Sequence, residues 1–390
     1  MKTKILPVII CTAFTGFTVT SNAQANQSLS NLTSPTAVNQ SLLPSTAHSK
    51  NLGSSSNQWQ YLYLYGRIYI NGALTMHAHG TQNFFAGPYA GNISVTGIDN
   101  TGTGEYALTK ITSGNDNTAN GLNALYYNTT GDYNSATGSY ALYSTTEGAS
   151  SNTADGANSL LNNTAGSYNT AVGASALTYA KSGNYNTAVG FAAFPTTNSY
   201  QNSTALGYEA IISASNQVRI GNSSITSIGG YTNWSNISDG RVKKNIKSNV
   251  PGLAFINQLN AVTYNLDLDA ADKILQPPAL KDKDEKVPQP SQQEITARKE
   301  KEQIIYSGFI AQDVEAAAKK IGYDFSGIDA PKNDNNVYGL RYSDFVVPLV
   351  KAVQELSKQN DSLKKEYDAK FTAQQNEIDE LKAMIVSNQS

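Results

Sequence analysis

A glycine recurs along the middle of the chain at an almost constant interval, and this interval limits the possible folds more than any other feature. Successive glycines are 17 residues apart, except for one step of 18. The glycines that define the register are Gly87, Gly104, Gly121, Gly138, Gly156, Gly173, Gly190 and Gly207. Self-similarity at a fixed short period is typical of repeat proteins, in which each unit packs only against its neighbours.

The register contains more than glycine. An asparagine precedes most of these glycines by four residues, and a small residue followed by an apolar one comes three and four residues after them. These pairs are Ala107-Leu108, Ala124-Leu125, Ala141-Leu142, Ser159-Leu160, Ala176-Leu177, Ala193-Phe194 and Ala210-Ile211. Glycine suits a turn with positive φ, asparagine amides can stack from unit to unit, and the apolar residues can fill a narrow core.

A unit of this length is too short for a helical hairpin. It fits one coil of a β-roll with two short strands, each of roughly three to five residues. We therefore predict a mainly β chain: a repeat-built β-roll or β-solenoid fibre over residues 83–211, then a small α+β domain that ends in a long helix. The repeat resembles the head repeats of trimeric bacterial adhesins, although those units are usually shorter.

Tyrosines stand at equivalent positions in several repeats, namely Tyr133, Tyr168 and Tyr185. Together with Asn, Thr and Ser they would give a surface suited to a host or environmental glycan, or to a matrix protein, through stacking and hydrogen bonds. Packing between subunits would explain the same tyrosines equally well. Both interpretations stay open at this point.

The start of the chain resembles an export signal. Residues 1–23 combine two lysines, an apolar stretch and a small-residue cleavage site, and they contain the sole cysteine, Cys11. The mature chain would then have no disulfide. Residues 24–50 are too polar to bury a core and are predicted to be flexible. We expect an exported protein, at the cell surface or extracellular, and we find no later apolar stretch of the roughly 20 residues that a transmembrane segment needs.

Residues 51–82 form an aromatic strand module, because Trp59 to Tyr65 alternate aromatic residues with others that are mostly leucine. Further on, His77 and His79 could share one face of a strand. A metal site needs three or four ligands, so two solvated histidines in a loop are the preferred interpretation and no metal is assigned. Residues 212–237 leave the repeat register and are predicted to form a cap and neck.

A short basic segment follows the neck, at the point where a low-charge region meets a highly charged one. Ser238 can act as a nucleophile only if a base takes its proton, and Lys243 can be that base only when it is neutral. A hairpin turn at Asp239-Gly240 would make Lys243 the diagonal cross-strand neighbour of Ser238. Burial and nearby cations such as Arg241 would favour the neutral amine. An ordinary surface turn is the alternative explanation of the pattern.

This segment resembles the start of the intramolecular chaperone domain found at the C-terminus of phage tailspikes and endosialidases. That family opens with Ser-Asp-x-Arg-x-Lys, which Ser238, Asp239, Arg241 and Lys243 match. Further motifs follow in the family order: Pro251-Gly252-Leu253, Val262-Thr263-Tyr264, Gly308 to Val314, Tyr342-Ser343-Asp344 and Val347 to Glu355. The similarity extends over about the last 155 residues.

The resemblance implies a homotrimeric domain that assists folding of the preceding fibre and then releases itself by Ser-Lys autoproteolysis. Ser238 would be the nucleophile and Lys243 the general base, with Asp239 and Arg241 as possible supporting residues. The bond cut would be Ile237-Ser238, through an N-to-O acyl shift and hydrolysis of the resulting ester. Such a self-cleaving serine endopeptidase acts on its own chain and uses no cofactor.

Within the C-terminal part, residues 238–345 form the chaperone domain, with a charged insertion at 267–303 that is predicted to be solvated and partly disordered. Residues 346–390 are predicted to form a coiled-coil helix, with Asn360 at a core position. The apolar a and d residues are Val346, Leu349, Val353, Leu356, Leu363 and Tyr367, and, after a four-residue shift, Phe371, Ile378, Leu381 and Ile385. A lone amphipathic helix folded on its own domain is the alternative.

Composition narrows the function classes. Charged residues make up only 15% of the chain and the net charge is −2, so nothing in the sequence favours a nucleic-acid partner. The favoured hypothesis is an adhesin-like trimeric fibre whose terminal domain drives trimerisation and then cuts itself off. The alternative is a purely structural adhesive protein with an uncleaved trimerisation knob. A glycan hydrolase lacks the expected pair of acidic residues at an equivalent repeat position.

Overall fold

The computed structural model describes residues 66–146, 148–195, 199–275 and 292–388. The predicted leader, the flexible segment and the alternating strand Trp59–Tyr65 lie outside these residues. No helix in the described part of the chain is long and apolar enough to cross a membrane.

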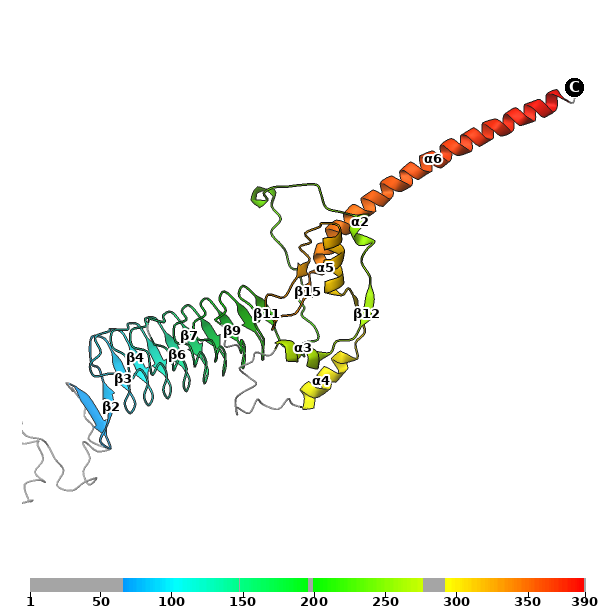
Figure 1. Cartoon of the computed structure of the whole chain (residues 1–390). Helices are drawn as coiled ribbons and strands as arrows, with labels where there is room; N and C mark the ends of the chain where they lie inside the picture. Colours follow the sequence, from blue (N-terminus) through cyan, green and yellow to red (C-terminus); the bar gives the residue numbers. More distant parts are fainter. Residues whose placement is uncertain (1–65, 147, 196–198, 276–291, 389–390) are drawn as a thin grey trace, which may run out of the picture. The chain divides into compact units, whose positions relative to one another are not determined.

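The repeat region is a β-solenoid, as predicted (Figure 1). Its strands join in one sheet in sequence order, and from β3 onward every neighbouring pair is parallel. The strands are β3 (Phe84–Ala86), β4 (Thr101–Thr103), β5 (Thr118–Asn120), β6 (Ser135–Thr137), β7 (Thr153–Asp155), β8 (Thr170–Val172), β9 (Thr187–Val189), β10 (Thr204–Leu206) and β11 (Val218–Ile220).

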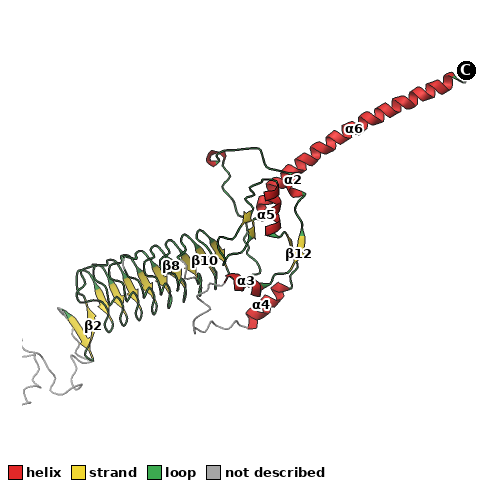
Figure 2. Ribbon diagram, in the orientation of Figure 1, coloured by secondary structure: helices red, strands yellow, loops and turns green. Residues whose placement is uncertain are grey.

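The prediction of two strands per coil was wrong, because each coil has one strand of three residues (Figure 2). At the small-apolar pair after each glycine the backbone turns: Tyr140 has φ 58° and Leu142 has φ 50°, both left-handed, and equivalent residues in the other coils do the same. Leucine is not β-branched, so it tolerates this conformation better than Val or Ile would.

The recurrent asparagines form a buried ladder, which confirms the predicted stacking of amides. The Asn100 backbone N–H and Nδ2 both donate to Oδ1 of Asn83, at 2.8 and 3.1 Å. Asn117 repeats this arrangement on Asn100. Because buried polar groups are costly without partners, the ladder fixes the register of one coil on the next.

The recurrent glycines allow the coils to approach closely. Gly156 has φ 135°, and a Cβ atom added there would lie 2.5 Å from the carbonyl carbon of Gly173 in the next coil. The core beside this contact is made of completely buried side chains, such as Leu142 and Leu160. The 17-residue period therefore reflects one glycine contact and one asparagine contact per coil.

The ends of the sheet depart from the repeat. At the first end, the hairpin β1 (Arg67–Ile70) and β2 (Ala73–His77) joins β3 in antiparallel fashion. His77 was expected to be solvated in a loop, but it ends β2 and is buried, with Nε2 2.8 Å from the Ala90 carbonyl oxygen. His79 accepts a hydrogen bond from Arg67 Nε. At the other end, β11 still pairs with β10, so the sheet continues into the segment predicted as a cap.

The C-terminal region is a small α+β unit. It contains α2 (Leu253–Ile256), β12 (Val262–Tyr264), α3 (Leu268–Leu275), α4 (Gln292–Glu302), β13 (Tyr306–Gly308), α5 (Ala311–Lys320), β14 (Ile328–Asp329), β15 (Gly339–Leu340) and α6 (Val346–Ser387). β12 pairs antiparallel with β13, and β14 with β15. Phe255, Val314, Phe325 and Phe345 form the centre of its core.

The charged segment 267–303 is helical at both of its described ends, in α3 and α4, and Arg298 joins the two helices through ion pairs with Asp269 and Asp272. Residues 276–291 lie outside the described part. Ile310 is the N-cap residue of α5 and is 47% exposed.

Candidate functional site

The structure places Ser238 and Lys243 in contact. The amine Nζ of Lys243 donates a hydrogen bond to Oγ of Ser238 across 2.9 Å. A single 3₁₀ turn, η3 (Gly240–Val242), separates the two residues. The predicted hairpin at Asp239-Gly240 is therefore wrong, although the proximity that it was meant to explain is present.

Asp239 explains why a 3₁₀ turn replaces the hairpin. It is the N-cap of η3, and its Oδ1 accepts a hydrogen bond from the backbone N–H of Arg241 at 2.9 Å. Asp is a favoured N-cap residue because its short carboxylate satisfies a backbone donor that the turn leaves free. The turn closes with the Lys243 backbone N–H donating to Gly240 O. The Asp239 side chain thus accepts a backbone hydrogen bond, a role that a partner strand would have in a hairpin.

Asp239 also forms an ion pair with Arg241. The guanidinium Nε lies 3.1 Å from Oδ1 and Nη2 lies 2.5 Å from Oδ2. The side-chain hydrogen bonds from Arg241, followed by the backbone one, hold the pKa of Asp239 below its usual range. The carboxylate nearest to Lys243 in sequence is therefore engaged by a different cation, and the Lys243 amine is left to the serine hydroxyl.

In the single chain this site is open to solvent. Ser238, Lys243 and all other residues from 225 to 249 are exposed, and Ile237, directly before Ser238, is 89% exposed. The burial expected to keep Lys243 neutral is therefore not supplied by the part of the chain that the structure describes.

The neck has a regular pattern that was missed in the sequence. From residue 225 onward its apolar residues recur every third position as Ile225, Ile228, Tyr231, Trp234 and Ile237, with exposed fractions from 42% to 110%. In an extended chain with three residues per turn, such a pattern puts all five side chains on one face. The period of three could have been found from the sequence alone. It ends at Ile237, directly before Ser238.

The segment after the site is anchored to the long helix. The backbone N–H of Leu253 donates to Oε2 of Glu355 at 2.8 Å, and a Cβ atom on Gly252 would lie 2.6 Å from the backbone nitrogen of Ala352. The Pro251-Gly252-Leu253 turn therefore needs glycine at its centre because it packs directly on α6. Phe255, just beyond, is completely buried in the core.

A second contact joins two more of the motifs. The backbone N–H of Phe309 donates to the Tyr342 hydroxyl at 3.1 Å, and a Cβ atom on Gly308 would lie 2.3 Å from that same hydroxyl oxygen. Phe309 also stacks on Phe345, with ring centroids 5.4 Å apart. Motifs that are far apart in the sequence thus meet in one small core.

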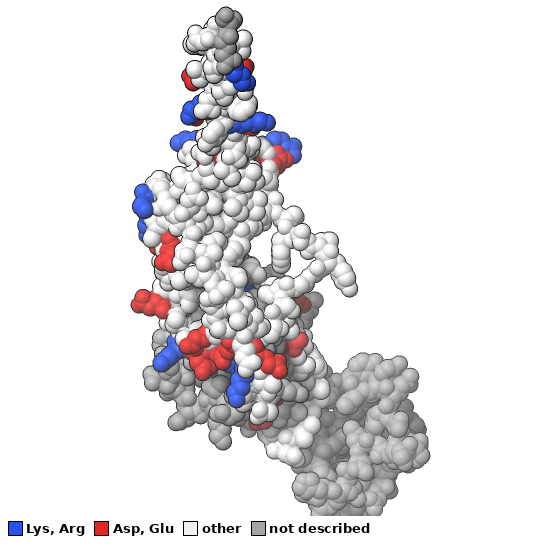
Figure 3. Space-filling view, turned by 90° about the vertical axis from the view of Figure 1, so that its right-hand side faces the viewer, with Lys and Arg blue, Asp and Glu red and all other residues white. Residues whose placement is uncertain are grey.

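Among the described residues, no group of three or more His, Cys, Asp or Glu side chains is placed to hold a metal ion. A serine hydroxyl in contact with a lysine amine is an arrangement in which a neutral amine can activate the hydroxyl as a nucleophile. Figure 3 shows acidic and basic side chains interspersed on the face that it displays.

Comparison with known proteins assigns the segment that contains this site. No curated protein and no solved structure matches the chain. One family model does match, described as chaperone of endosialidase, and it covers residues 238–323. The match starts at Ser238 and contains both residues of the contact described above. Following its β-solenoid, the chain therefore carries a C-terminal domain of the endosialidase chaperone family.

Proposed function

We propose that the chain is exported, assembles into a trimer through its C-terminal domain, and then cuts itself between Ile237 and Ser238. The family match supports an intramolecular chaperone role for the C-terminal region, and self-cleaving peptidase activity is a general property of this family. The observation that carries the cutting step is the 2.9 Å contact between Lys243 Nζ and Ser238 Oγ.

The reaction uses atoms of this segment and one water molecule. A neutral Lys243 amine accepts the proton of the Ser238 hydroxyl, and Oγ attacks the carbonyl carbon of Ile237. The C–N bond breaks as the Ser238 nitrogen takes a proton from Lys243, which leaves an ester between Ile237 and Ser238 Oγ. Water then hydrolyses the ester, giving a carboxylate at Ile237 and a new amino terminus at Ser238.

Trimerisation would supply the burial that the single chain lacks. The exposed apolar face of the neck ends at Ile237, so chains that pack along this face would enclose the Ser238-Lys243 pair. The helix α6 supports the same conclusion. Residues 356–387 of α6 are all exposed, and they include Leu363, Phe371 and Leu381 at the predicted core positions of a coiled coil. An apolar stripe of this length is typical of a helix that packs against other copies.

In this proposal, assembly of the trimer precedes cleavage. The amine would lose its proton only when neighbouring chains remove water from around it, because desolvation disfavours the charged form of lysine. Cleavage would then mark a correctly assembled fibre. The β-solenoid coils, which leave backbone groups open at each end of the sheet, would fold on the assembled domain.

The test is the chemistry of the two fragments. Purified full-length protein should yield a small fragment that begins at Ser238 and a large one that ends at Ile237, as determined by mass spectrometry. Hydroxylamine added during processing should leave a hydroxamate on Ile237, because it attacks the ester faster than water does. A chain that stays intact in its assembled form would instead identify an adhesive protein with a permanent trimerisation knob.

A further inference from the structure

One face of the solenoid carries a continuous cluster of tyrosines that ends abruptly. Tyr89 stacks on Tyr106 in the next coil, with ring centroids 5.0 Å apart and planes within 10°. Tyr126 stacks on Tyr143 in the same way, at 5.5 Å. These separations match the distance between neighbouring coils, so each ring covers the face of the ring before it.

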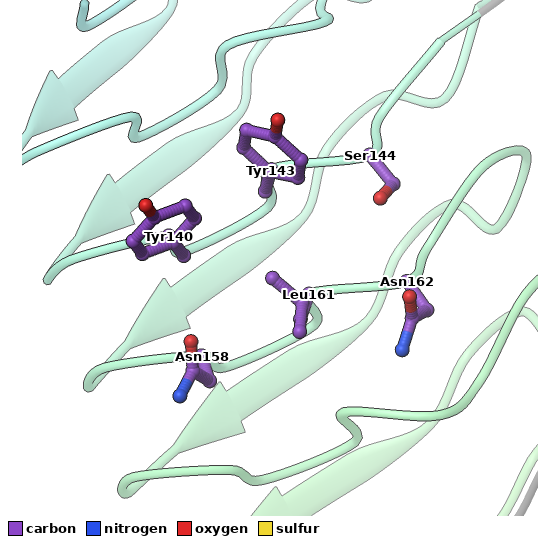
Figure 4. Close-up of a pocket in the computed structure, with 6 residues that line it drawn as sticks. All are labelled: Tyr140, Tyr143, Ser144, Asn158, Leu161 and Asn162. Carbon is purple, nitrogen blue, oxygen red and sulfur yellow. The ribbon is translucent and has the colours of Figure 1, made fainter.

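The cluster stops at the coil that contains Tyr140 and Tyr143. In the next coil the equivalent positions hold Asn158 and Leu161, which have no ring to continue the stack. The result is a hollow of about 360 Å³ beside the last two tyrosines. Figure 4 shows its lining, which consists of Tyr140, Tyr143, Ser144, Asn158, Leu161 and Asn162.

The hollow combines an aromatic wall with polar groups and no charge. Tyr143 is held in place by its neighbours: its ring lies 5.1 Å from that of Tyr127 and 5.3 Å from that of Tyr140. Asn162 donates its Nδ2 to Thr178 O at 2.9 Å, which orients its amide and leaves Oδ1 as an acceptor. The side chains of Ser144 and Asn158 add a hydroxyl and an amide, both of which can donate and accept.

We propose that this hollow binds one hexopyranose unit of a neutral glycan, whose ring takes the place of the missing aromatic ring. A pyranose has an apolar C–H face, which fits against Tyr143, and a rim of hydroxyls, which fits the amides and the hydroxyl of the opposite wall. The volume is in the range of ligand sites, roughly 300–1,000 Å³. The absence of charged side chains in the lining favours a neutral sugar over an acidic one.

This site is distinct from the column of tyrosines selected from the sequence. Tyr168 and Tyr185 are exposed, but they stack on each other with centroids 5.1 Å apart and planes within 6°. Each therefore covers a face of the other. Tyr143, in contrast, borders an open hollow. The proposal concerns binding by the repeats and does not depend on self-cleavage.

The test compares glycan binding by the wild-type protein and by Leu161→Tyr, which supplies the missing ring and fills the hollow. Purified full-length protein should bind an oligosaccharide from a panel terminated by glucose, galactose or mannose, and it should bind the sialylated counterpart more weakly. Leu161→Tyr should weaken that binding about tenfold or more, because a stacked ring contributes on this scale. The matched control, Val172→Tyr, adds a tyrosine on an exposed strand position outside the hollow and should bind as the wild type does.

Three results would overturn the proposal. The first is a wild-type protein that binds no member of the panel. The second is a Leu161→Tyr variant that binds as well as the wild type while keeping the wild-type circular dichroism spectrum. The third is a Leu161→Tyr variant whose sedimentation coefficient shows altered assembly, since the hollow would then be a contact between copies of the chain. None of these results would affect the fragment analysis that tests self-cleavage.

Discussion

Lys243 donates a hydrogen bond from Nζ to Ser238 Oγ over 2.9 Å, and a single 3₁₀ turn lies between the two residues. If this pair performs the cleavage, Lys243→Ala should lower the rate about 10²- to 10⁴-fold, the usual contribution of a general base. Ser238→Ala should remove cleavage altogether. Gel electrophoresis of freshly expressed protein over time measures both.

The matched control for this experiment is Lys244→Ala. Lys244 is the next residue and is also exposed, so its removal changes the local charge equally but spares the contact with Ser238. It should cleave at close to the wild-type rate. Equal loss in both lysine variants would show that positive charge, and not a base at Lys243, is what matters.

Arg241 should act by holding the Asp239 carboxylate in an ion pair. Removal of its guanidinium in Arg241→Ala frees the Asp239 carboxylate to pair with Lys243 and to keep that amine protonated. We expect cleavage to slow about two- to five-fold, the modest scale of an exposed ion pair. The double variant Arg241→Ala with Asp239→Asn should recover rate relative to the single one. A double variant that is slower still would contradict this role, and the measurement is again the time course of fragment formation.

Trp234 should be required for assembly although it does not contact the Ser238-Lys243 pair. It is 87% exposed in the single chain and belongs to the period of three in the neck. Trp234→Ser should weaken association at least tenfold, in line with aromatic anchors of interfaces, and it should stop cleavage as a consequence. Sedimentation velocity and gel analysis of the same sample measure the two effects.

Asn233→Ser is the control for the neck, because Asn233 stands next to Trp234 but outside the period of three. It should assemble and cleave normally. A Trp234→Ser protein that remained monomeric but still produced both fragments would separate cleavage from assembly. The burial argument for Lys243 would then fail.

The glycine contacts between coils make a further prediction about stability. Gly156→Ala places a Cβ atom 2.5 Å from the backbone of Gly173, whereas Gly148, also at positive φ, has open space around an added Cβ atom. Both variants incur the conformational cost of alanine at positive φ. Only Gly156→Ala also forces the coils apart, so its free energy of unfolding should be lower than that of Gly148→Ala by about 1–3 kcal/mol. Denaturant unfolding of the Ser238→Ala background measures this difference.

His77 should make the first end of the solenoid sensitive to acid. Burial lowers the pKa of His77, with the charges of His79 and Arg67 acting in the same direction against a hydrogen bond to Ala90. The unfolded state therefore binds a proton more readily than the folded state. The contribution of neutral His77 to the free energy of unfolding is fully present above about pH 6.5, and it is lost progressively as the pH falls below this value. The amides of β2 and β3 should lose protection from hydrogen exchange as the pH falls. The variant His77→Gln should remove the pH dependence of this protection.

The sequence predicted the coil more fully than it predicted the site. The glycine and asparagine positions could be identified because each coil imposes the same contact on its neighbour, so the physical requirement recurs visibly. The second strand was predicted wrongly, because an alternating pair such as Ala141-Leu142 does not reveal that Leu142 takes a left-handed φ. That choice depends on contacts with adjacent coils.

At the site, spacing alone could not distinguish a hairpin from a 3₁₀ turn. Asp-Gly suits both, and the outcome depends on whether a partner strand exists on either side. Here the Asp239 carboxylate caps the Arg241 amide and no strand forms. The sequence could not predict how exposed Lys243 is, because exposure depends on which other segments and chains surround the residue. In the single chain Lys243 is exposed.

Within the solenoid, neighbouring coils pair through equivalent strand contacts, such as Thr170 with Thr187. Duplicating or deleting one 17-residue unit in the gene would therefore lengthen or shorten the solenoid by a single rise of about 4.8 Å, and every remaining junction between coils would stay as it was. The length of the solenoid can therefore change during evolution in small, equal steps, without changes to the structures at either end.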